Sequence, residues 1–249
     1  MIAGGCGGKA HRSLPPLPPA GHGGPHDAEA VGFRATDGLG LRGRLFGSGR
    51  TAIVLSHMGN RPDSEADWYP MARRLARAGY LVLTFNRRGV CVGEDPGYDC
   101  SAGIHDFTTT WKDIVGAVRF VQAKGADQVA VAGASIGGTS AVYAAATGKI
   151  RTAALISLAG VNHISSYSIT RAQVASIPGA KLFVSGRRDG DGAAQSAREW
   201  DGWASAPKRL VLLDSDMHGT DMFAPASGVG PQLTKLIVGF LEQHAPPRG

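Results

Sequence analysis

Residues 131–140, VAGASIGGTS, place a serine between small residues directly after a continuous apolar run. The chain of 249 residues contains 36 glycines, so a G-x-S-x-G pattern arises readily by chance and has little weight alone. Its position is what matters, because a strand-like segment ends just before Ser135 and a helix-like segment begins just after it. So sharp a turn strains its central residue and leaves no room for Cβ atoms at Gly133 and Gly137. The stretch therefore predicts a strand, a nucleophile turn and a helix, with an ordinary helix N-cap at Ser135 as the alternative.

Strand-like and helix-like segments alternate on both sides of this turn. A hairpin is predicted around Asp37 and Gly38, where AVGFRAT and LGLRGRLFG flank a turn signal. Further strands are predicted over 51–57, 81–89, 128–134, 152–160, 181–186 and 208–214, and helices over 66–80, 108–125, 136–148, 193–205 and 231–244. Continuous apolar strands that alternate with helices are typical of a mostly parallel sheet with helices on both faces. The predicted fold class is α/β, in one domain over residues 28–249.

The distribution of charge argues against a nucleic-acid partner. The formal net charge is +6, but Lys and Arg occur singly or in pairs such as Arg73–Arg74 and Arg87–Arg88, without a basic run. Binding to a polyanion requires clustered positive charge. No stretch approaches the roughly 18 consecutive apolar residues that span a bilayer, so no transmembrane segment is expected.

Residues 1–27 differ from the rest of the chain in composition. They are rich in Gly, Pro, Ala and His and show no helical or strand period, which predicts a disordered tail or tether. The stretch IAGGCGG is similar to the end of a bacterial lipoprotein signal, with Cys6 as the lipid-anchored residue, but the charged and long apolar regions of such a signal are missing. A plain flexible tail with a free Cys6 is the alternative. The first interpretation implies an exported or cell-envelope protein, and the second leaves a cytoplasmic protein open.

Cys91 and Cys100 flank a turn-rich loop that is short enough for their sulfur atoms to meet. In an exported protein they are expected to form a disulfide, and in a cytosolic protein to stay reduced. The suggestion of export at the N-terminus favours the disulfide. Neither cysteine has the spacing of a zinc or redox motif, so no metal site is expected.

A catalytic Ser135 needs two further residues. A serine hydroxyl is a poor nucleophile at neutral pH, so it needs a base, and the base needs an acid that orients it. Asp189 comes just after one predicted strand and His218 lies in the loop after the last one, at the sheet edge where such partners belong. Asp191 competes with Asp189, which is preferred because it is nearer the strand end. The chain order predicts a triad of Ser135, Asp189 and His218, with ordinary loop residues as the alternative.

An oxyanion hole supplies two backbone N–H groups to the reacting carbonyl oxygen. One is expected from Ile136, directly after the nucleophile, where the helix start also directs partial positive charge at the site. The other is expected from the loop HMGN, either from Met58 or from Gly59, and the sequence does not decide between them. His57, at the start of that loop, is interpreted as structural.

Four stretches together carry a resemblance to a known family. They are LSHMGNRPDSEADWYPMARRLARAGYLVLTFNRRG, VAGASIGGTS, SGRRD and MHGTDMF, in that order. Over nearly all of residues 30–245 the chain resembles the α/β-hydrolase superfamily, in particular small bacterial esterase-like and dienelactone-hydrolase-like members. The resemblance implies an eight-stranded sheet and Ser-Asp-His hydrolysis. Met58 stands where many relatives have glycine, which leaves the oxyanion donor open, and Asn86 stands where they have aspartate, which is expected to alter loop anchoring more than chemistry.

The substrate is less well indicated than the machinery. About twenty residues separate strands 152–160 and 181–186, too few for a large cap domain, so an open site is expected. Residues 164–173 (ISSYSITRAQ) and Trp68–Tyr69 are candidates for its lining, although Trp68 fits a helix core equally well. The chain is therefore predicted to be a serine esterase that cleaves short acyl or aryl esters through an acyl-enzyme, with no cofactor. Peptidase, amidase or lactone hydrolysis by the same triad, and a non-catalytic binding protein on this scaffold, are the alternatives.

Overall fold

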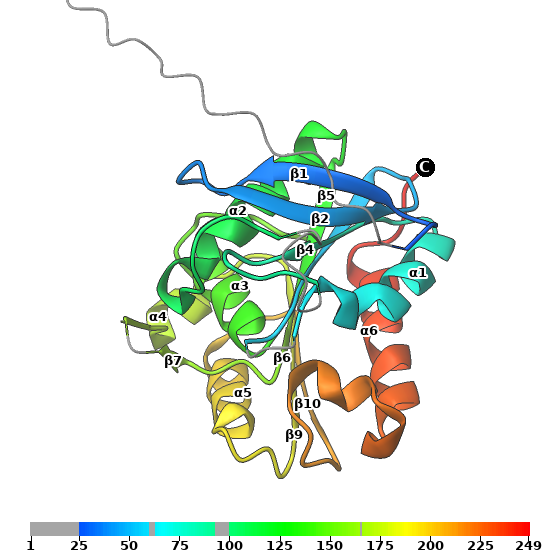
Figure 1. Ribbon diagram of the computed structural model, residues 1–249. Coiled ribbons are helices and arrows are strands. Elements are labelled where there is room, and N and C mark those ends of the chain that lie inside the picture. The colour runs from blue at the N-terminus through cyan, green and yellow to red at the C-terminus, as the bar shows by residue number, and fades with distance from the viewer. Residues whose placement is uncertain (1–24, 60–62, 93–99, 165) are drawn as a thin grey trace, which may run out of the picture.

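A computed structural model describes residues 25–59, 63–92, 100–164 and 166–249. Within these ranges an eight-stranded sheet forms the centre of the molecule, in the strand order β1-β2-β4-β3-β5-β6-β9-β10 (Figure 1). Its strands are β1 (Glu29–Arg34), β2 (Gly40–Phe46), β3 (Thr51–Ser56), β4 (Leu81–Asn86), β5 (Gln128–Ala134), β6 (Ala154–Leu158), β9 (Ala180–Gly186) and β10 (Lys208–Leu213). The hairpin β1–β2 is antiparallel and β2 pairs antiparallel with β4, whereas all later neighbours are parallel. The predicted mostly parallel α/β sheet is confirmed.

Helices cover both faces of the sheet. The helices are α1 (Tyr69–Arg77), α2 (Thr110–Ala123), α3 (Ile136–Ala146), α4 (Arg171–Ala175), α5 (Ala193–Trp203) and α6 (Gly230–His244). Figure 1 shows α1 and α6 on one side of the sheet and α2, α3 and α5 on the other. Buried side chains accordingly form two apolar cores, one under α1 and α6 and one under α2, α3 and α5. A parallel sheet requires this double cover, because side chains alternate between its faces and both sets are apolar.

The structure departs from the predicted elements in detail. The predicted helix 66–80 is a 3-10 turn, η1 (Glu65–Trp68), followed by α1, because Pro70 lacks an N–H and fits the first turn of a helix. Between β6 and β9 lie two short strands, β7 (His163–Ile164) and β8 (Tyr167–Ser168), and the one-turn helix α4, none of which was predicted. Apart from residue 165, this connection is described in full, and it contains no large cap domain.

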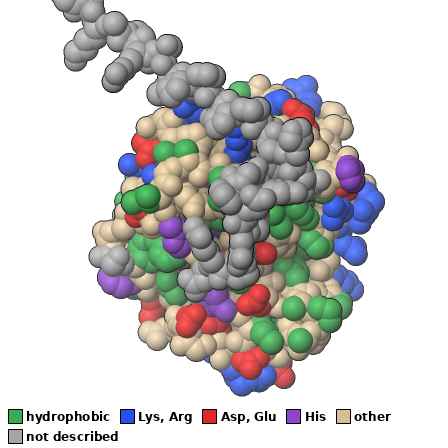
Figure 2. Space-filling model, in the orientation of Figure 1, with side chains coloured by type: hydrophobic (Ala, Val, Ile, Leu, Met, Phe, Trp, Pro, Cys, Tyr) green, Lys and Arg blue, Asp and Glu red, His purple; other side chains and the backbone are tan. Residues whose placement is uncertain are grey.

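The ends of the predicted domain differ in what can be described. Residues 1–24 of the predicted tail, with the proposed anchor residue Cys6, lie outside the described ranges. Asp27, at the end of that predicted tail, forms an ion pair with Arg73 of α1 at 2.8 Å. None of the helices in the described ranges combines the length and the apolar character needed to cross a membrane. On the face drawn in Figure 2, acidic side chains gather in the lower half, where the loops after β9 and β10 lie in Figure 1.

Close backbone contact holds α2 against the edge of the sheet. Gly116 lies in the middle of α2, and a Cβ atom there would be 2.3 Å from the carbonyl oxygen of Arg34 at the end of β1. No real Cβ contact is that short, so only glycine lets the helix approach the hairpin this closely. Gly239, in the middle of α6, has no heavy atom within 4 Å of the corresponding position.

Two glycine-to-alanine substitutions test this packing. Gly116→Ala is expected to lower the free energy of unfolding by about 1–3 kcal/mol, because the helix must move away from β1. Gly239→Ala is expected to raise it by about 0.5–1 kcal/mol, because alanine loses less backbone entropy in a helix. Urea denaturation of both variants measures the difference, and equal effects would contradict the close approach of α2 to β1.

Candidate active site

The strand-turn-helix predicted around Ser135 is present. Strand β5 ends at Ala134 and helix α3 begins at Ile136. Ser135 has φ 50° and ψ −120°. Residues other than glycine rarely adopt this backbone conformation, which costs roughly 1–3 kcal/mol. Its N–H donates to the carbonyl of Leu158 in the neighbouring strand at 2.8 Å, which helps to hold the strained turn. The side chain is partly exposed at the carboxyl edge of the sheet.

The flanking glycines are sterically required, as expected. A Cβ atom on Gly133 would lie 2.3 Å from the carbonyl carbon of Gly137. A Cβ atom on Gly137 would lie 2.6 Å from the carbonyl oxygen of Ser56 and 2.7 Å from that of His57. The first turn of α3 is therefore pressed against both the end of β5 and the end of β3, and no other residue type fits these positions.

His218 and Asp189 lie together beyond the ends of the last two strands. The Nδ1 atom of His218 is 2.8 Å from Oδ2 of Asp189. The Asp189 side chain is 1% exposed and that of His218 is 23% exposed. Hydrogen bonding to a buried carboxylate holds the proton on Nδ1 and leaves the lone pair on Nε2, the arrangement that a general base needs.

Short contacts between the two loops keep this pair in place. The N–H of Arg188 donates to the carbonyl of Ser215 at 3.0 Å, and the N–H of Arg187 donates to that of Leu213 at 2.8 Å. A Cβ atom on Gly186, at the end of β9, would lie 2.7 Å from the Ser215 oxygen. The loop that carries Asp189 therefore lies directly on the loop that carries His218.

The surroundings of His218 favour its protonated form. Burial acts to lower its pKa, but the hydrogen bond and charge of Asp189 and the charges of Asp191 and Asp221 outweigh burial and raise the pKa above 6.5. Asp191 is the weaker partner, since its Oδ2 is 3.7 Å from Nδ1 and its side chain is 74% exposed. The geometry thus favours Asp189 over Asp191 as the orienting acid.

These three residues also have the composition of a metal site. Ligand atoms of Asp189, Asp191 and His218 all lie within 4.8 Å of one another. A metal ion would need the lone pair of a histidine nitrogen, and Nδ1 instead carries the proton that it donates to Asp189. The donor set therefore fits a hydrogen-bonded acid and base better than a metal centre.

Three segments that are distant in the sequence meet beside Ser135. Gly219 follows His218 and has φ 53°, and a Cβ atom there would lie 2.7 Å from the sulfur of Met58 and 3.4 Å from Cβ of Ala134. Ala134 is the residue before Ser135, and Met58 lies in the segment His57–Gly59 after β3, here called the β3 loop. The structure thus brings the predicted base, nucleophile and oxyanion segment to the same edge of the sheet.

His57 is part of the framework of the β3 loop. It is fully buried, its Nδ1 lies 2.8 Å from the Met58 carbonyl oxygen, and its Nε2 accepts the N–H of Arg87 at 3.1 Å. Burial lowers its pKa well below 6.5 and the charge of Arg87 adds to this, so the ring stays neutral. With both ring nitrogens bonded to the backbone, His57 has no nitrogen left for proton transfer, which agrees with the structural role expected from the sequence.

The family comparisons agree with this architecture. Residues 53–215, more than half of the chain, match the family model described as alpha/beta hydrolase fold. The chain belongs to the α/β-hydrolase family. No curated protein sequence shows significant similarity to it.

Solved structures of α/β hydrolases superimpose on most of this chain. An esterase from Pyrococcus furiosus, Pf2001, gives a TM-score of 0.73 at 17% identity over 92% of this chain and 98% of its own. An enol-lactonase from Burkholderia xenovorans LB400 gives 0.63 at 17% identity over 84% and 99%. An esterase from Exiguobacterium antarcticum gives 0.62 at 17% identity over 86% and 100%. At such identities the likeness establishes the fold.

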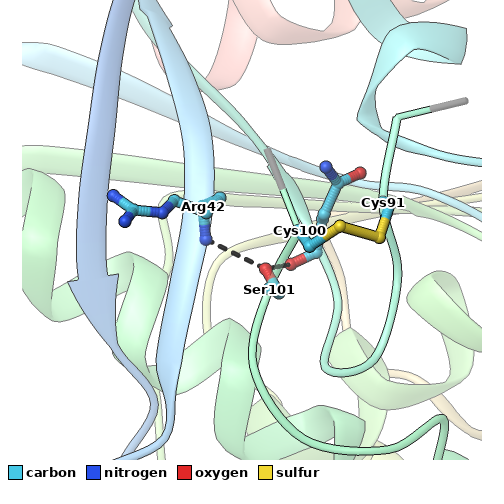
Figure 3. The surroundings of a disulfide bond; sticks show 5 residues. Arg42, Cys91, Cys100 and Ser101 are labelled. Carbon is cyan, nitrogen blue, oxygen red and sulfur yellow. Dashed lines mark hydrogen bonds between the residues drawn. A yellow bond between two sulfur atoms is a disulfide. The ribbon is translucent and has the colours of Figure 1, made fainter. Parts of the chain in front are cut away.

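The loop after β4 in this α/β hydrolase is tied to the hairpin at the sheet edge. Cys91 and Cys100 form a disulfide, as the sequence favoured, and the residues 93–99 that they enclose lie outside the described ranges (Figure 3). The hydroxyl of Ser101 accepts the N–H of Arg42 in β2 at 2.9 Å and donates to the carbonyl of Asn86 at the end of β4. The disulfide therefore adjoins a polar link between β2 and β4, which pair antiparallel in the sheet.

Asn86 anchors a loop, as expected for the position where relatives have aspartate. Its side-chain oxygen accepts the N–H of Glu65 at 2.9 Å. Glu65 is fully buried, and the hydroxyl of Thr84 donates to its Oε2 at 2.7 Å. Burial raises the pKa of Glu65 to about 8 despite the Thr84 hydrogen bond and the nearby Arg44. Asn86 thus joins the end of β4 to the start of η1.

Of the two candidates for the lining of the site, Trp68 is excluded by its position and the other segment is not. Trp68 is fully buried and packs edge-on against Phe223 with ring centroids 5.5 Å apart, so it belongs to the core. In the predicted segment 164–173, Tyr167 stacks on Tyr143 of α3 with ring centroids 4.1 Å apart. Just before that segment, the hydroxyl of Thr139 exchanges hydrogen bonds with the backbone of Val161. The second segment thus remains a candidate for the lining.

Arg87 and Arg88, noted in the sequence only as a pair of charges, are both tied to buried partners. Arg88 binds the buried Asp113 and the partly buried Asp37, joining the loop after β4 to α2 and to the hairpin turn. Arg87 is fully buried, and its Nη2 donates to the carbonyls of Met58 at 2.8 Å and Gly59 at 3.2 Å. Two adjacent arginines directly after an apolar strand could have indicated buried hydrogen bonds or ion pairs at this end of the sheet, because buried charges need partners.

The protonation of Glu65 can be tested through pH-dependent stability. Because its pKa is higher in the folded state than the usual 4.5, its stabilising contribution is complete below about pH 4.5 and is lost as pH rises toward 8. Glu65→Gln keeps an acceptor for Thr84 but does not titrate. As the pH rises from 5 to 8, the free energy of unfolding of wild type is therefore expected to fall by about 2–4 kcal/mol more than that of Glu65→Gln. Urea denaturation at both pH values measures this, with the exposed Glu29→Gln as the matched control. Parallel pH dependences in Glu65→Gln and wild type would show that Glu65 is ionised in the folded protein.

Proposed function

We propose that this α/β hydrolase is a serine esterase that cleaves short acyl or aryl esters of small molecules. The observation that carries the proposal is the 2.8 Å hydrogen bond between the buried Asp189 and His218. The residue after His218 packs against the residue before the strained Ser135. An acid, a base and a hydroxyl on a strained turn at one sheet edge are the components of nucleophilic acyl transfer.

The mechanism follows from the bonding of each group. Asp189 holds the proton on Nδ1 of His218, so that Nε2 takes the proton of the Ser135 hydroxyl as its oxygen attacks the ester carbonyl. The oxyanion is stabilised by the N–H of Ile136 and by a second N–H from Met58 or Gly59. Protonated His218 then gives its proton to the leaving alcohol. Water activated by the same nitrogen hydrolyses the acyl-enzyme and restores Ser135, and no cofactor enters these steps.

Substrate size and bond type are supported by the surroundings of the site and by the relatives. The connection between β6 and β9 lacks a large cap in its described residues, which favours small or accessible substrates. A polar hollow of about 310 Å³ lies beside Asp191, between residues 161–163 and the start of α5. Two of the similar structures are described as esterases and one as an enol-lactonase, so lactones are the second candidate substrates.

Active-site labelling and turnover test the proposal. Wild type is expected to react with a fluorophosphonate probe and to hydrolyse p-nitrophenyl acetate and butyrate, whereas Ser135→Ala is expected to lose both activities because the attacking oxygen is gone. His218→Ala is expected to lose turnover for want of a base. Equal labelling of wild type and Ser135→Ala would refute the nucleophile. Turnover of peptides or enol-lactones in place of these esters would refute the esterase assignment and keep the triad.

The two aspartates beside His218 provide a matched pair for the acid. Asp189→Asn is expected to lower kcat by about 10³–10⁴, because the imidazole loses the partner that fixes its tautomer. Asp191→Asn is expected to keep kcat within about threefold, since it lies farther from Nδ1 and is exposed.

The charges beside His218 also affect the pH dependence of kcat/KM. His218 acts only when neutral and its pKa is raised above 6.5, so kcat/KM of wild type is expected to fall with decreasing pH around a midpoint above 6.5. Asp191→Asn removes one of the charges that raise this pKa, so its midpoint is expected at lower pH. A pH–rate profile from pH 5 to 9 measures both, and a profile that does not respond to Asp191→Asn would contradict this account.

A further inference from the structure

The β3 loop is held by one buried arginine through both its backbone and its side chain. The N–H of Arg87 donates to Nε2 of His57, and its Nη2 donates to the carbonyl oxygens of Met58 and Gly59. The guanidinium carbon lies 5.5 Å from the centre of the Phe107 ring. That ring also borders the loop, since a Cβ atom on Gly59 would lie 3.0 Å from Phe107 Cζ. Burial lowers the pKa of Arg87 to about 10, so it is charged at neutral pH.

The contacts of the Met58 carbonyl indicate which way the peptide between Met58 and Gly59 faces. In a trans peptide the C=O and the N–H point in opposite directions. Strand β4 neighbours β3 on the side opposite to β5, so Arg87, after β4, and Ser135, after β5, flank the β3 loop from opposite sides. The Met58 carbonyl points at Arg87, and the N–H of Gly59 therefore points to the side of Ser135.

The preceding peptide faces the other way. A Cβ atom on Gly137 would lie 2.7 Å from the carbonyl oxygen of His57, so this oxygen is directed at the first turn of α3. The N–H of Met58, on the same peptide, then points away from α3. Gly59 also lies beside Ile136, since a Cβ atom on Gly59 would be 3.4 Å from Ile136 Cγ2. Of the two candidates in the β3 loop, Gly59 is the one whose N–H shares a side with that of Ile136.

We propose that Arg87 is a positioning residue that fixes the Met58–Gly59 peptide, and that Gly59 rather than Met58 supplies the second oxyanion N–H. The inference rests on the proposed function, because an oxyanion forms only if Ser135 attacks a carbonyl. Arg87 does not touch the substrate in this proposal. Arg87 holds the carbonyl oxygens of Met58 and Gly59 away from the ester, so that they do not repel the oxyanion. The same contacts turn the N–H of Gly59 toward the oxyanion.

The details of the Arg87 contacts suit this role better than a purely structural one. Its Nε and Nη1 atoms are buried and have no hydrogen-bond partner within the described part of the chain. Buried donors without partners destabilise a fold, so the guanidinium is a poor means of stabilising this region. The Met58 carbonyl retains His57 Nδ1 as a donor when the arginine side chain is removed, which lets the loop fold without it.

Kinetics of side-chain variants test the positioning role. Arg87→Met is expected to lower kcat for p-nitrophenyl butyrate by about 10- to 100-fold with KM within about threefold, since a donor that acts in the transition state is misplaced. Arg87→Lys is expected to recover most of the loss, because an ammonium group can donate to the same carbonyls. Arg42→Met, which removes another buried arginine side chain, is the matched control and is expected to keep wild-type kcat.

Inhibitor binding separates positioning from general damage. A trifluoromethyl ketone forms an oxyanion with Ser135, and its inhibition constant is expected to weaken in Arg87→Met by the same factor as kcat/KM. The affinity of the product butyrate, which forms no such adduct, is expected to stay within about threefold. Unchanged kcat in Arg87→Met, or a rise in KM alone, would overturn the proposal.

Backbone substitution tests the donor directly. Glycolic acid at position 59 exchanges the N–H for an ester oxygen and is expected to lower kcat by about 10²–10³. The α-hydroxy analogue of methionine at position 58 is the matched control and is expected to leave kcat within about threefold. The opposite pattern would assign the donor to Met58.

The outcomes separate a failure of the Arg87 proposal from a failure of the proposed function. If Arg87→Met does not fold, Arg87→Lys and the two backbone variants decide. A wild-type protein that neither turns over the ester nor reacts with the fluorophosphonate at Ser135 overturns the proposed function and this inference with it. A wild type that does both, beside Arg87 and Gly59 variants of equal activity, overturns the inference alone.

Discussion

The steric constraint at the turn between β5 and α3 is the feature on which the rest of the site depends. Ser135 can hold a φ of 50° only because its neighbours two residues away are glycines, one pressed against the other and one against the end of β3. The strain is maintained by the surrounding structure, since β5 is a central strand with parallel partners on both sides and α3 is buried along its length. A looser turn would point the hydroxyl away from the edge where the other loops end.

Parallel strand order then accounts for the remaining components. Strands β3, β5, β9 and β10 all end at the same edge, so the loops that follow them meet there although up to 160 residues separate them. Each loop is secured by a buried polar contact: His57 and Arg87 hold the β3 loop, and backbone hydrogen bonds join the loops of Asp189 and His218. Buried polar groups without partners are costly, so each contact also restricts its loop to one conformation.

Most of the fold, and the meeting of the candidate site residues at one edge of the sheet, could be predicted from the chain alone. Apolar runs of strand length and helical spacing placed the main elements within a few residues, because these patterns record which faces are buried. Predictions failed where the determinants are not periodic. The strands β7 and β8 have two residues each, α4 is one turn long, and Trp68 fitted a core or a pocket equally well until its burial was known. The roles of Arg87 and Arg88 were not predicted, because their partners lie up to 51 residues away in the sequence.

The sequence by itself determined the chemistry that is available: a serine on a glycine-flanked turn, with an aspartate and a histidine after later strands. These follow from local sterics and from chain order, which need no knowledge of distant contacts. Only the tertiary structure placed Asp189 rather than Asp191 at hydrogen-bond distance from His218, showed His57 to be neutral and buried, and brought Arg87 to the carbonyls of the β3 loop. Each of these depends on the distance and burial of groups that are remote in the sequence, and such quantities exist only once the chain has folded.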